Sequence, residues 1–211
     1  PEGLPLKEGF PPPALRWLDS ASLWWLRAAK EALASGRAED PSGVGQVVGL
    51  GWGPTTPTNT LISTVYRESF AAMPPGTFPY SVGNAPAGQA GILLKLKGPA
   101  VTLTAKESAG LAALVEACRF VCSGAMDACL AGGVDQMDPF LVKVLTALQA
   151  PGSPPPGEGA FALLLKAAAA APAGALARVA AWCSPSAACA PHLYPSEPRG
   201  LYDRVLDELD R

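Results

Sequence analysis

Histidine is almost missing from this sequence, because the 211 residues contain only one, His192. Charged residues are also scarce at 16% of the chain, and 16 Lys and Arg nearly balance 18 Asp and Glu. The resulting net charge of -2 predicts no attraction to nucleic acid or to an anionic membrane. A single histidine excludes any mechanism within this chain that needs two imidazoles.

Long apolar runs and leader patterns are missing too. No uninterrupted apolar run reaches the roughly 18 residues that a membrane-spanning helix needs. Residues 1–13 lack the basic and apolar pattern of a signal peptide, although Pro1 in place of Met leads us to expect that a few leading residues are absent. These features predict a cytoplasmic protein with no membrane span.

The cysteines do not form a recognisable metal or disulfide framework. They are odd in number and lack zinc-ribbon spacing, which favours a reduced protein. Cys118 and Cys122 could share one helix face and, with Cys129 and His192, ligate a metal. Buried, apolar thiols are the more common arrangement, so we expect no metal and no other cofactor. The five positions are Cys118, Cys122, Cys129, Cys183 and Cys189.

Apolar residues and turn formers are abundant. Hydrophobic residues make up 49% of the chain, and it contains 22 Gly and 23 Pro, which together indicate a globular protein with many turns. We expect a single domain over residues 1–211, with a proline-rich arm at 1–14 and a shortened connector at 151–157.

The first half of the chain predicts helices around one buried strand. Asp19 and Ser20 offer caps to a helix that continues to Leu33 and stops at Gly36. The β-branched run from Val44 to Leu50 predicts a buried strand. A second helix is expected over 60–72, and a polar loop over 84–89 that leads into an apolar helical run.

The second half predicts a strand, a helix and a strand, which is typical of a sheet covered by helices. The expected order is a strand at 100–104, a helix at 108–120 and a strand at 128–131 that Gly132-Gly133 ends. Further strands are expected at 160–166, in a central position, and at 178–183, before a closing helix at 201–209.

Six short motifs between residues 84 and 160 resemble, in the same order, motifs in the N-terminal half of β-ketoacyl-ACP synthases. The resemblance covers roughly Leu15 to Leu209. The resemblance implies an α/β, thiolase-like fold, with this chain as a single N-terminal-type half. That half is a mixed five-stranded sheet with helices on both faces. The motifs are Asn84-x-x-x-Gly88-Gln89, Leu96-Lys97-Gly98-Pro99, Ser108-Ala109-Gly110-Leu111, Ser123-Gly124, Leu130-Ala131-Gly132-Gly133 and Gly157-Glu158-Gly159-Ala160.

The chain departs from the family pattern at three places. Glu107 occupies the position of the nucleophilic cysteine, so the charge is retained but no thioester can form. The family's two catalytic histidines and lysine come from the C-terminal half, which the resemblance does not reach. The link between Gly133 and Gly157 also lacks the family's longer Pro-Phe-Asp segment. We therefore expect no condensing enzyme by itself.

The resemblance implies instead a catalytically degenerate partner subunit in fatty-acid or polyketide-type biosynthesis. Chain-length factors are ketosynthase-like proteins of this kind and pair with an active ketosynthase. We expect a homodimer or a heterodimer with an active ketosynthase, and an acyl-carrier protein as a further partner. The residues expected at the interface are Val101, Leu103, Ala105, Asn84 and Gln89.

Two enzymatic alternatives stay open. Glu107 could replace the nucleophile in a malonyl-ACP decarboxylase, although the usual hydrogen-bond donors are absent. Ser108 could instead be the nucleophile of a hydrolase, with Asp135 or Asp138 as the acid and His192 as the base. Against the hydrolase, Lys106 occupies the position where a strained turn needs a glycine.

Overall fold

A computed structural model describes residues 9–11, 15, 18–149, 152, 155–167, 169 and 175–179. Its framework is a sheet with strand order β2-β1-β3-β4. β1 pairs in parallel with β2 and β3, and β4 pairs antiparallel with β3, so the sheet is mixed as predicted. The bounds are β1 Gly45–Leu50, β2 Ala100–Thr104, β3 Ala128–Asp135 and β4 Gly159–Lys166.

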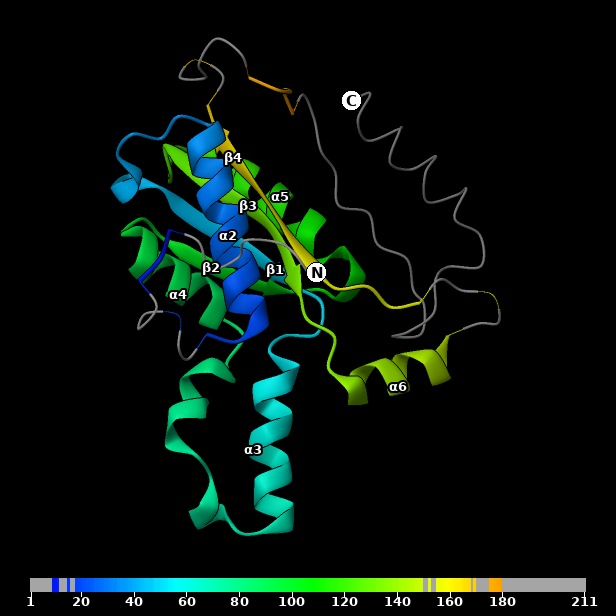
Figure 1. Cartoon of the computed structure of the whole chain (residues 1–211). Coiled ribbons are helices and arrows are strands. Elements are labelled where there is room, and N and C mark those ends of the chain that lie inside the picture. Colours follow the sequence, from blue (N-terminus) through cyan, green and yellow to red (C-terminus); the bar gives the residue numbers. More distant parts are fainter. Residues whose placement is uncertain are drawn as a thin grey trace.

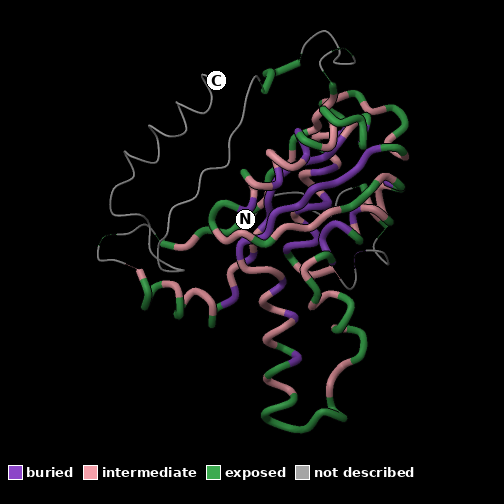
Figure 2. Tube along the Cα trace, turned by 180° about the vertical axis from the view of Figure 1, so that it is seen from behind, coloured by how far each residue is buried: buried purple, intermediate pink, exposed green. Residues whose placement is uncertain are grey.

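Helices cover both faces of this sheet (Figure 1). On one face lie α2 (Ser20–Ser35) and α4 (Ala85–Leu94), and on the other lies α5 (Ala109–Cys122). In β1, Val48 packs with α2, whereas its neighbour Val47 packs with α5, and both are completely buried. Cover on both faces explains why this strand is an uninterrupted apolar run rather than an alternating one. Figure 2 shows the resulting buried centre.

A buried hydrogen-bond chain joins three elements on the α2 face. Trp25 of α2 is completely buried, and its Nε1 donates to Oε1 of Gln46 in β1 at 3.1 Å. The Nε2 of Gln46 then donates to the carbonyl oxygen of Ala87 in α4, also at 3.1 Å. The glutamine thus satisfies two buried polar groups, as an interior amide must. It sets the position of α2 and α4 relative to β1.

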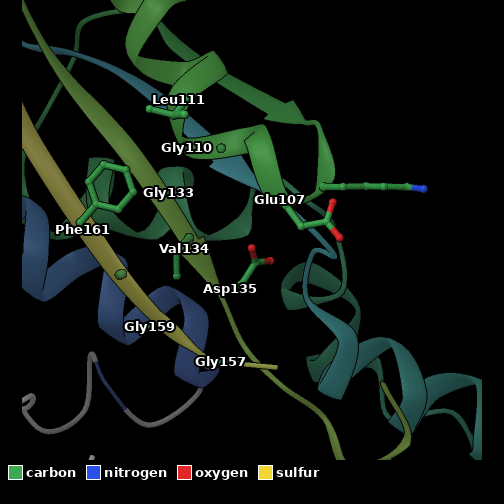
Figure 3. Close-up of a pocket in the computed structure, with 12 residues that line it drawn as sticks. Glu107, Gly110, Leu111, Gly133, Val134, Asp135, Gly157, Gly159 and Phe161 are labelled. Atoms are coloured by element: carbon green, nitrogen blue, oxygen red, sulfur yellow. The ribbon is translucent and has the colours of Figure 1, made fainter. Parts of the chain in front are cut away.

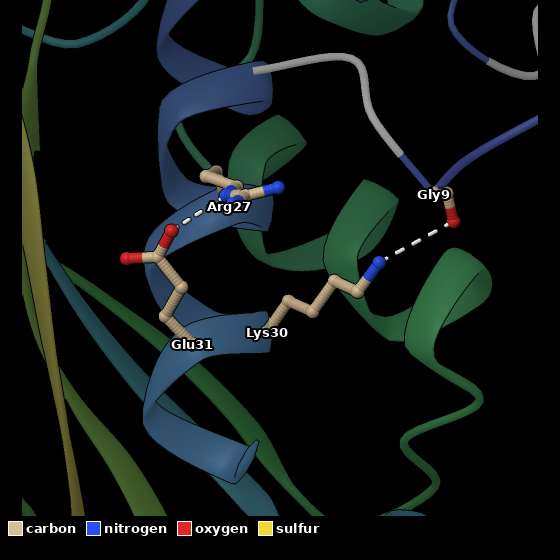
Figure 4. Close-up of polar contacts among 4 residues, drawn as sticks. All are labelled: Gly9, Arg27, Lys30 and Glu31. Atoms are coloured by element: carbon tan, nitrogen blue, oxygen red, sulfur yellow. Dashed lines mark hydrogen bonds and ion pairs between the residues drawn. The ribbon is translucent and has the colours of Figure 1, made fainter. Parts of the chain in front are cut away.

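The helix α2 also contacts the residues near the start of the chain. Asp19 caps α2 by accepting a hydrogen bond from the backbone N–H of Ser22, as the sequence predicted. On the outer face, Lys30 Nζ donates to the Gly9 carbonyl at 3.4 Å (Figure 4). The same Nζ lies 4.4 Å from the centre of the Phe10 ring. One turn earlier, Arg27 pairs with Glu31 at 2.6 Å, an exposed contact that contributes little stability.

Two expectations about the strands were wrong. β3 does not end at Gly132-Gly133 but continues to Asp135, because these glycines allow neighbouring backbone to approach the strand rather than ending it. A Cβ on Gly132 would collide with the carbonyl oxygen of Phe161 in β4. β4 itself forms an edge of the described sheet, not a central strand.

The expected fifth strand and the closing helix cannot be placed within the described part of the chain. Arg178 and Val179 are described and are not part of a strand, whereas 180–183 and the expected helix at 201–209 lie outside the described residues. The arm at 1–14 and the connector at 151–157 are described only in part.

One group of elements extends from the carboxyl end of the sheet (Figure 1). It consists of α3 (Thr55–Arg67) and the short 3-10 helices η2 (Phe70–Ala72) and η3 (Pro75–Tyr80), and we call residues 55–82 the projection. The sequence predicted a helix at 60–72, so α3 begins and ends five residues earlier than expected. The polar loop expected at 84–89 is instead the first turn and a half of α4.

A further helix, α6 (Pro139–Leu148), follows β3 and was not predicted. Asp138 caps it by accepting from the backbone N–H of Phe140 at 2.8 Å. Within the described residues, no helix is long and apolar enough to cross a membrane.

Candidate functional site

The strand β2 leads into α5 through a sharp turn that carries Glu107. Lys106 has a φ of 48°, in the left-handed region that residues other than glycine seldom adopt. The short 3-10 helix η4 (Lys106–Ser108) then joins α5 directly, so Glu107 precedes its first turn. The partial positive charge at the start of a helix favours a carboxylate there. Lys106 therefore adopts the left-handed conformation that the sequence analysis expected to need a glycine.

Glycines bring the start of α5 against the two central strands. A Cβ on Gly49 of β1 would collide with the backbone of Ala109, the first residue of α5. A Cβ on Gly133 of β3 would lie 3.1 Å from the Cα of Gly110. Only glycine permits both close approaches. Their result is that the β2–α5 turn is fixed at the carboxyl ends of β1 and β3.

A pocket of about 500 Å³ opens at this place (Figure 3). Its lining includes the charged residues Lys106, Glu107 and Asp135, of which Glu107 and Asp135 lie on one polar side. Figure 3 shows Leu111 and Phe161 away from these acids, on an apolar side of the pocket, and Gly110 and Gly133 lie between the two sides. The pocket therefore has a charged end and a hydrophobic end.

Asp135 fixes the loop that follows β1. Its carboxylate accepts hydrogen bonds from the backbone N–H of Gly51 at 2.9 Å and of Trp52 at 3.0 Å. Burial raises the pKa of Asp135, the hydrogen bonds from Trp52 and Gly51 oppose that shift, and the charge of Glu107 raises it further. Figure 3 shows the side chains of Glu107 and Asp135 on the same side of the pocket. Two carboxyl groups thus share its polar end.

No thiol lines this pocket among the described residues. Cys118 and Cys129 are buried in the α5 layer, and burial raises the pKa of the Cys129 thiol to about 12. Burial likewise raises the pKa of Cys118, with a further contribution from Cys122, which is exposed at the end of α5. Thiols that stay protonated are poor nucleophiles. Cys183 and Cys189 lie outside the described residues.

The metal arrangement that the sequence left open is not formed by the described side chains. In the part of the chain that the structure describes, no group of three His, Cys, Asp or Glu side chains is placed to hold a metal ion. His192, the imidazole of that arrangement, lies outside it.

The serine and the two acids considered for a hydrolase each form hydrogen bonds with different partners. The Ser108 hydroxyl donates to the Ala105 carbonyl at 2.8 Å. Asp135 holds the loop after β1, and Asp138 accepts from Asn59 Nδ2 at 2.6 Å as well as from Phe140. Neither acid is hydrogen-bonded to an imidazole among the described residues, and the candidate base His192 is outside them.

The five expected interface residues lie on or near one edge of the sheet. Val101 and Leu103 of β2 pack partly against α5, and Ala105 follows them half-buried. Asn84 is exposed just before α4, and Gln89 is half-buried within it. Since β2 pairs only with β1 in the described sheet, its outer edge is open to another chain.

Comparison with known protein families identifies this arrangement. The family model for the β-ketoacyl synthase N-terminal domain matches residues 5–155, which is more than half of the chain. The chain belongs to the β-ketoacyl synthase family. Among curated proteins, none matches the sequence.

Solved ketosynthase structures have the same fold. The ishigamide ketosynthase/chain length factor is 25% identical with a TM-score of 0.70, and the match covers 81% of this chain and 49% of that one. A ketosynthase in complex with its chain length factor from Xenorhabdus doucetiae is 21% identical with a TM-score of 0.61, covering 75% of this chain and 61% of that one. A β-ketoacyl synthase from Burkholderia phymatum is 22% identical with a TM-score of 0.67, and the match covers 78% of this chain and 46% of that one.

These matches confirm the predicted fold, a thiolase-like ketosynthase half with helices on both faces of a mixed sheet. The chain spans roughly half the length of these ketosynthase structures.

Sequence reasoning missed two features of the ketosynthase-like site. Asp135 was considered as a hydrolase acid, whereas it holds the loop between β1 and α3. Phe161 was counted only as part of a strand, although its ring lies against Gly110 and Gly133 at the apolar end of the pocket. The glycines at matching positions of β1 and β3 were the available signal, because Gly49 and Gly133 are register partners.

Proposed function

We propose that this chain is a non-condensing, chain-length-factor-like partner subunit that pairs with an active ketosynthase in fatty-acid or polyketide-type biosynthesis. The observation that carries the proposal is the carboxylate of Glu107 at the turn between β2 and α5, the position that the resemblance assigns to the family's nucleophile. A carboxylate at this position cannot carry an acyl chain as a thioester.

The second carboxylate in the pocket adds to this argument. Asp135 lies on the same side of the pocket as Glu107, so a malonyl group would bring its own negative charge close to two acids. Like charges in a partly buried pocket repel each other. This repulsion disfavours the alternative role of a malonyl-ACP decarboxylase.

The open edge of β2 supports pairing with another chain. An unpaired strand edge is a ready template for a partner strand, and the half-buried apolar side chains of Val101 and Leu103 lie along this edge. Two of the solved relatives are described as a ketosynthase with its chain length factor. A third is described as a complex with an acyl-carrier protein, which we propose as a further partner.

Co-expression with a ketosynthase encoded beside this chain tests the proposal. We expect a one-to-one complex that survives purification at micromolar concentration, measured by light scattering. The isolated chain should form no β-ketoacyl product from acyl and malonyl carriers, and should release no carbon dioxide above the buffer rate. A product formed by the chain alone, or the lack of a complex, would contradict the proposal.

A further inference from the structure

The projection exposes an unusual amount of apolar surface. From residue 62 to residue 84, no residue is buried, although α3, η2 and η3 are all formed (Figure 2). Tyr66 is 87% exposed, Phe70 76% and Phe78 60%. Several large exposed apolar side chains within one segment favour an interaction site on a folded protein. The large apolar side chains exposed on the projection are Ile62, Val65, Tyr66, Phe70, Phe78 and Val82.

The projection does not bury enough surface to be stable on its own. Only Pro57 and Leu61 of α3 are buried. A helix of this length is marginal in water unless one of its faces packs against something. Charge does not explain the exposure either, because Arg67 and Glu68 are the only charged residues between 55 and 82. The missing contacts must come from another surface with few charges.

The base of the projection is nevertheless held firmly to the sheet. Gln136 Nε2, just after β3, donates to Thr56 Oγ1 at 2.7 Å. Asn59 Nδ2 donates to Asp138 Oδ1 at 2.6 Å, and within the projection Thr58 Oγ1 donates to the Ser81 carbonyl at 3.3 Å, which joins the two ends of its base. The exposed aromatic rings are therefore presented on a fixed support, which lowers the entropy lost on binding.

The projection is also continuous with the edge proposed for pairing. η3 leads within a few residues to Asn84 and α4, and α4 packs against β1 and β2. Burying an aromatic side chain removes about 150–250 Å² from water, so three rings would supply on the order of 500 Å². A stable interface needs about 800 Å² on each partner, and the β2 edge would supply the rest.

We propose that the projection packs its aromatic side chains onto an apolar, uncharged surface of the ketosynthase partner. Tyr66 and Phe70 are the central contacts, since they are the most exposed of its aromatic residues. This inference rests on the proposed function, because it takes the ketosynthase as the occupant. It adds that the projection, and not only the β2 edge, determines the affinity.

The test compares two variants of the full chain in binding to the purified ketosynthase. The double variant Tyr66→Asp/Phe70→Asp places charges on the projection, and the control Phe140→Asp places one on α6, where the phenyl ring is 64% exposed outside the projection. We expect the double variant to weaken binding at least about 30-fold, as loss of interface hot spots does. The control should stay within about threefold of the wild type.

The outcomes separate this inference from the proposed function. If the wild type binds the ketosynthase and the double variant binds equally well, the role of the projection is overturned while the partnership stands. If the wild type does not bind, the proposed function fails and the inference fails with it. Self-association that is lost in the double variant would also overturn it, because the occupant would then be a second copy.

Two further measurements distinguish a lost contact from a variant that fails to fold. Circular dichroism and urea unfolding should show that the double variant folds as the wild type does, and Tyr66→Ser serves as a milder variant if it does not. Amide hydrogen exchange of the wild type should slow at residues 62–80 when the ketosynthase binds. Unchanged exchange there in a formed complex would overturn the inference.

Discussion

The sheet around β1 and the projection at its carboxyl end are both poor in charge, yet they differ in where their apolar side chains are buried. In the sheet, Val47 and Val48 are completely buried between helices of the same chain. In the projection, no residue after Leu61 is buried. The difference teaches that low charge alone does not identify a core, because an apolar surface can also be built for another chain.

Backbone packing differs between the two regions in the same way. In the sheet, Gly49 and Gly133 allow α5 to approach so closely that a side chain on Gly49 would collide with it. In the projection, Gly76 has no atom within 4 Å of the place where its Cβ would lie. One region is packed to the limit, and the other has open space around its backbone.

The largest effect on the free energy of unfolding is expected for Gly49→Ala, and Gly76→Ala in the projection is its control. A Cβ at residue 49 collides with backbone of Ala109, which cannot move aside as a flexible side chain can. We expect Gly49→Ala to lower the free energy of unfolding by about 4 kcal/mol or more. Gly76→Ala should change it by less than about 0.5 kcal/mol. Urea unfolding of the isolated chain measures both, and equal effects would remove the contrast between the regions.

A smaller effect is expected for the buried amide of β1. Gln46→Leu leaves the Trp25 N–H without a partner in the interior and removes the second hydrogen bond to the Ala87 carbonyl, which keeps its bond within α4. An unsatisfied buried group costs about 1–3 kcal/mol, so we expect a loss in the same range, about 1–3 kcal/mol.

The matched control is Thr64→Val in the projection, where the hydroxyl donates to the Thr60 carbonyl in an exposed position. Solvent can replace that contact, so its loss should be below about 0.5 kcal/mol. Chemical denaturation of both variants gives the comparison. A threonine variant that loses as much stability as the glutamine variant would show that the projection is packed within this chain after all.

The smallest effect is expected at the junction of the two regions, where Asp135 holds the loop before α3. Burial raises its pKa above 3.8, so the folded chain takes up the proton more readily than the unfolded chain. Protonation of the Asp135 carboxyl group therefore stabilises the fold, so its contribution to the free energy of unfolding increases as the pH falls from neutral through the raised pKa. Asp135→Asn should remove that gain, which the difference between variant and wild-type urea unfolding at several pH values would show.

Asp40 offers a control of opposite sign. Its pKa is lowered by the hydrogen bond from the Ser42 backbone, so its contribution is present at neutral pH and is lost as the pH falls. Asp40→Asn should therefore change the pH profile in the sense opposite to Asp135→Asn. Two variants that shift the profile in the same direction would refute the burial of Asp135 as the cause.

Much of the fold was predictable because its signals are local. The cap at Asp19, the apolar run of β1, and the strand and helix around Glu107 all follow from neighbouring residues, and the structure contains each of them. α6 was missed because its signal, Pro139 after Asp138, is short and resembles a loop. The edge position of β4 was missed because an apolar run looks the same in a central strand and in an edge strand that packs on one face.

The sequence by itself determined most of the elements, the family resemblance and the presence of a carboxylate, Glu107, between a strand and a helix, since each of these depends on residue identity and spacing. Only the tertiary structure decided that Gly132 and Gly133 lie inside β3, that Asp135 shares a pocket with Glu107, and that the projection stays uncovered. The reason is physical. Close backbone approach, shared burial of two acids and an unpartnered face are relations between segments far apart in the chain, and no local pattern records them.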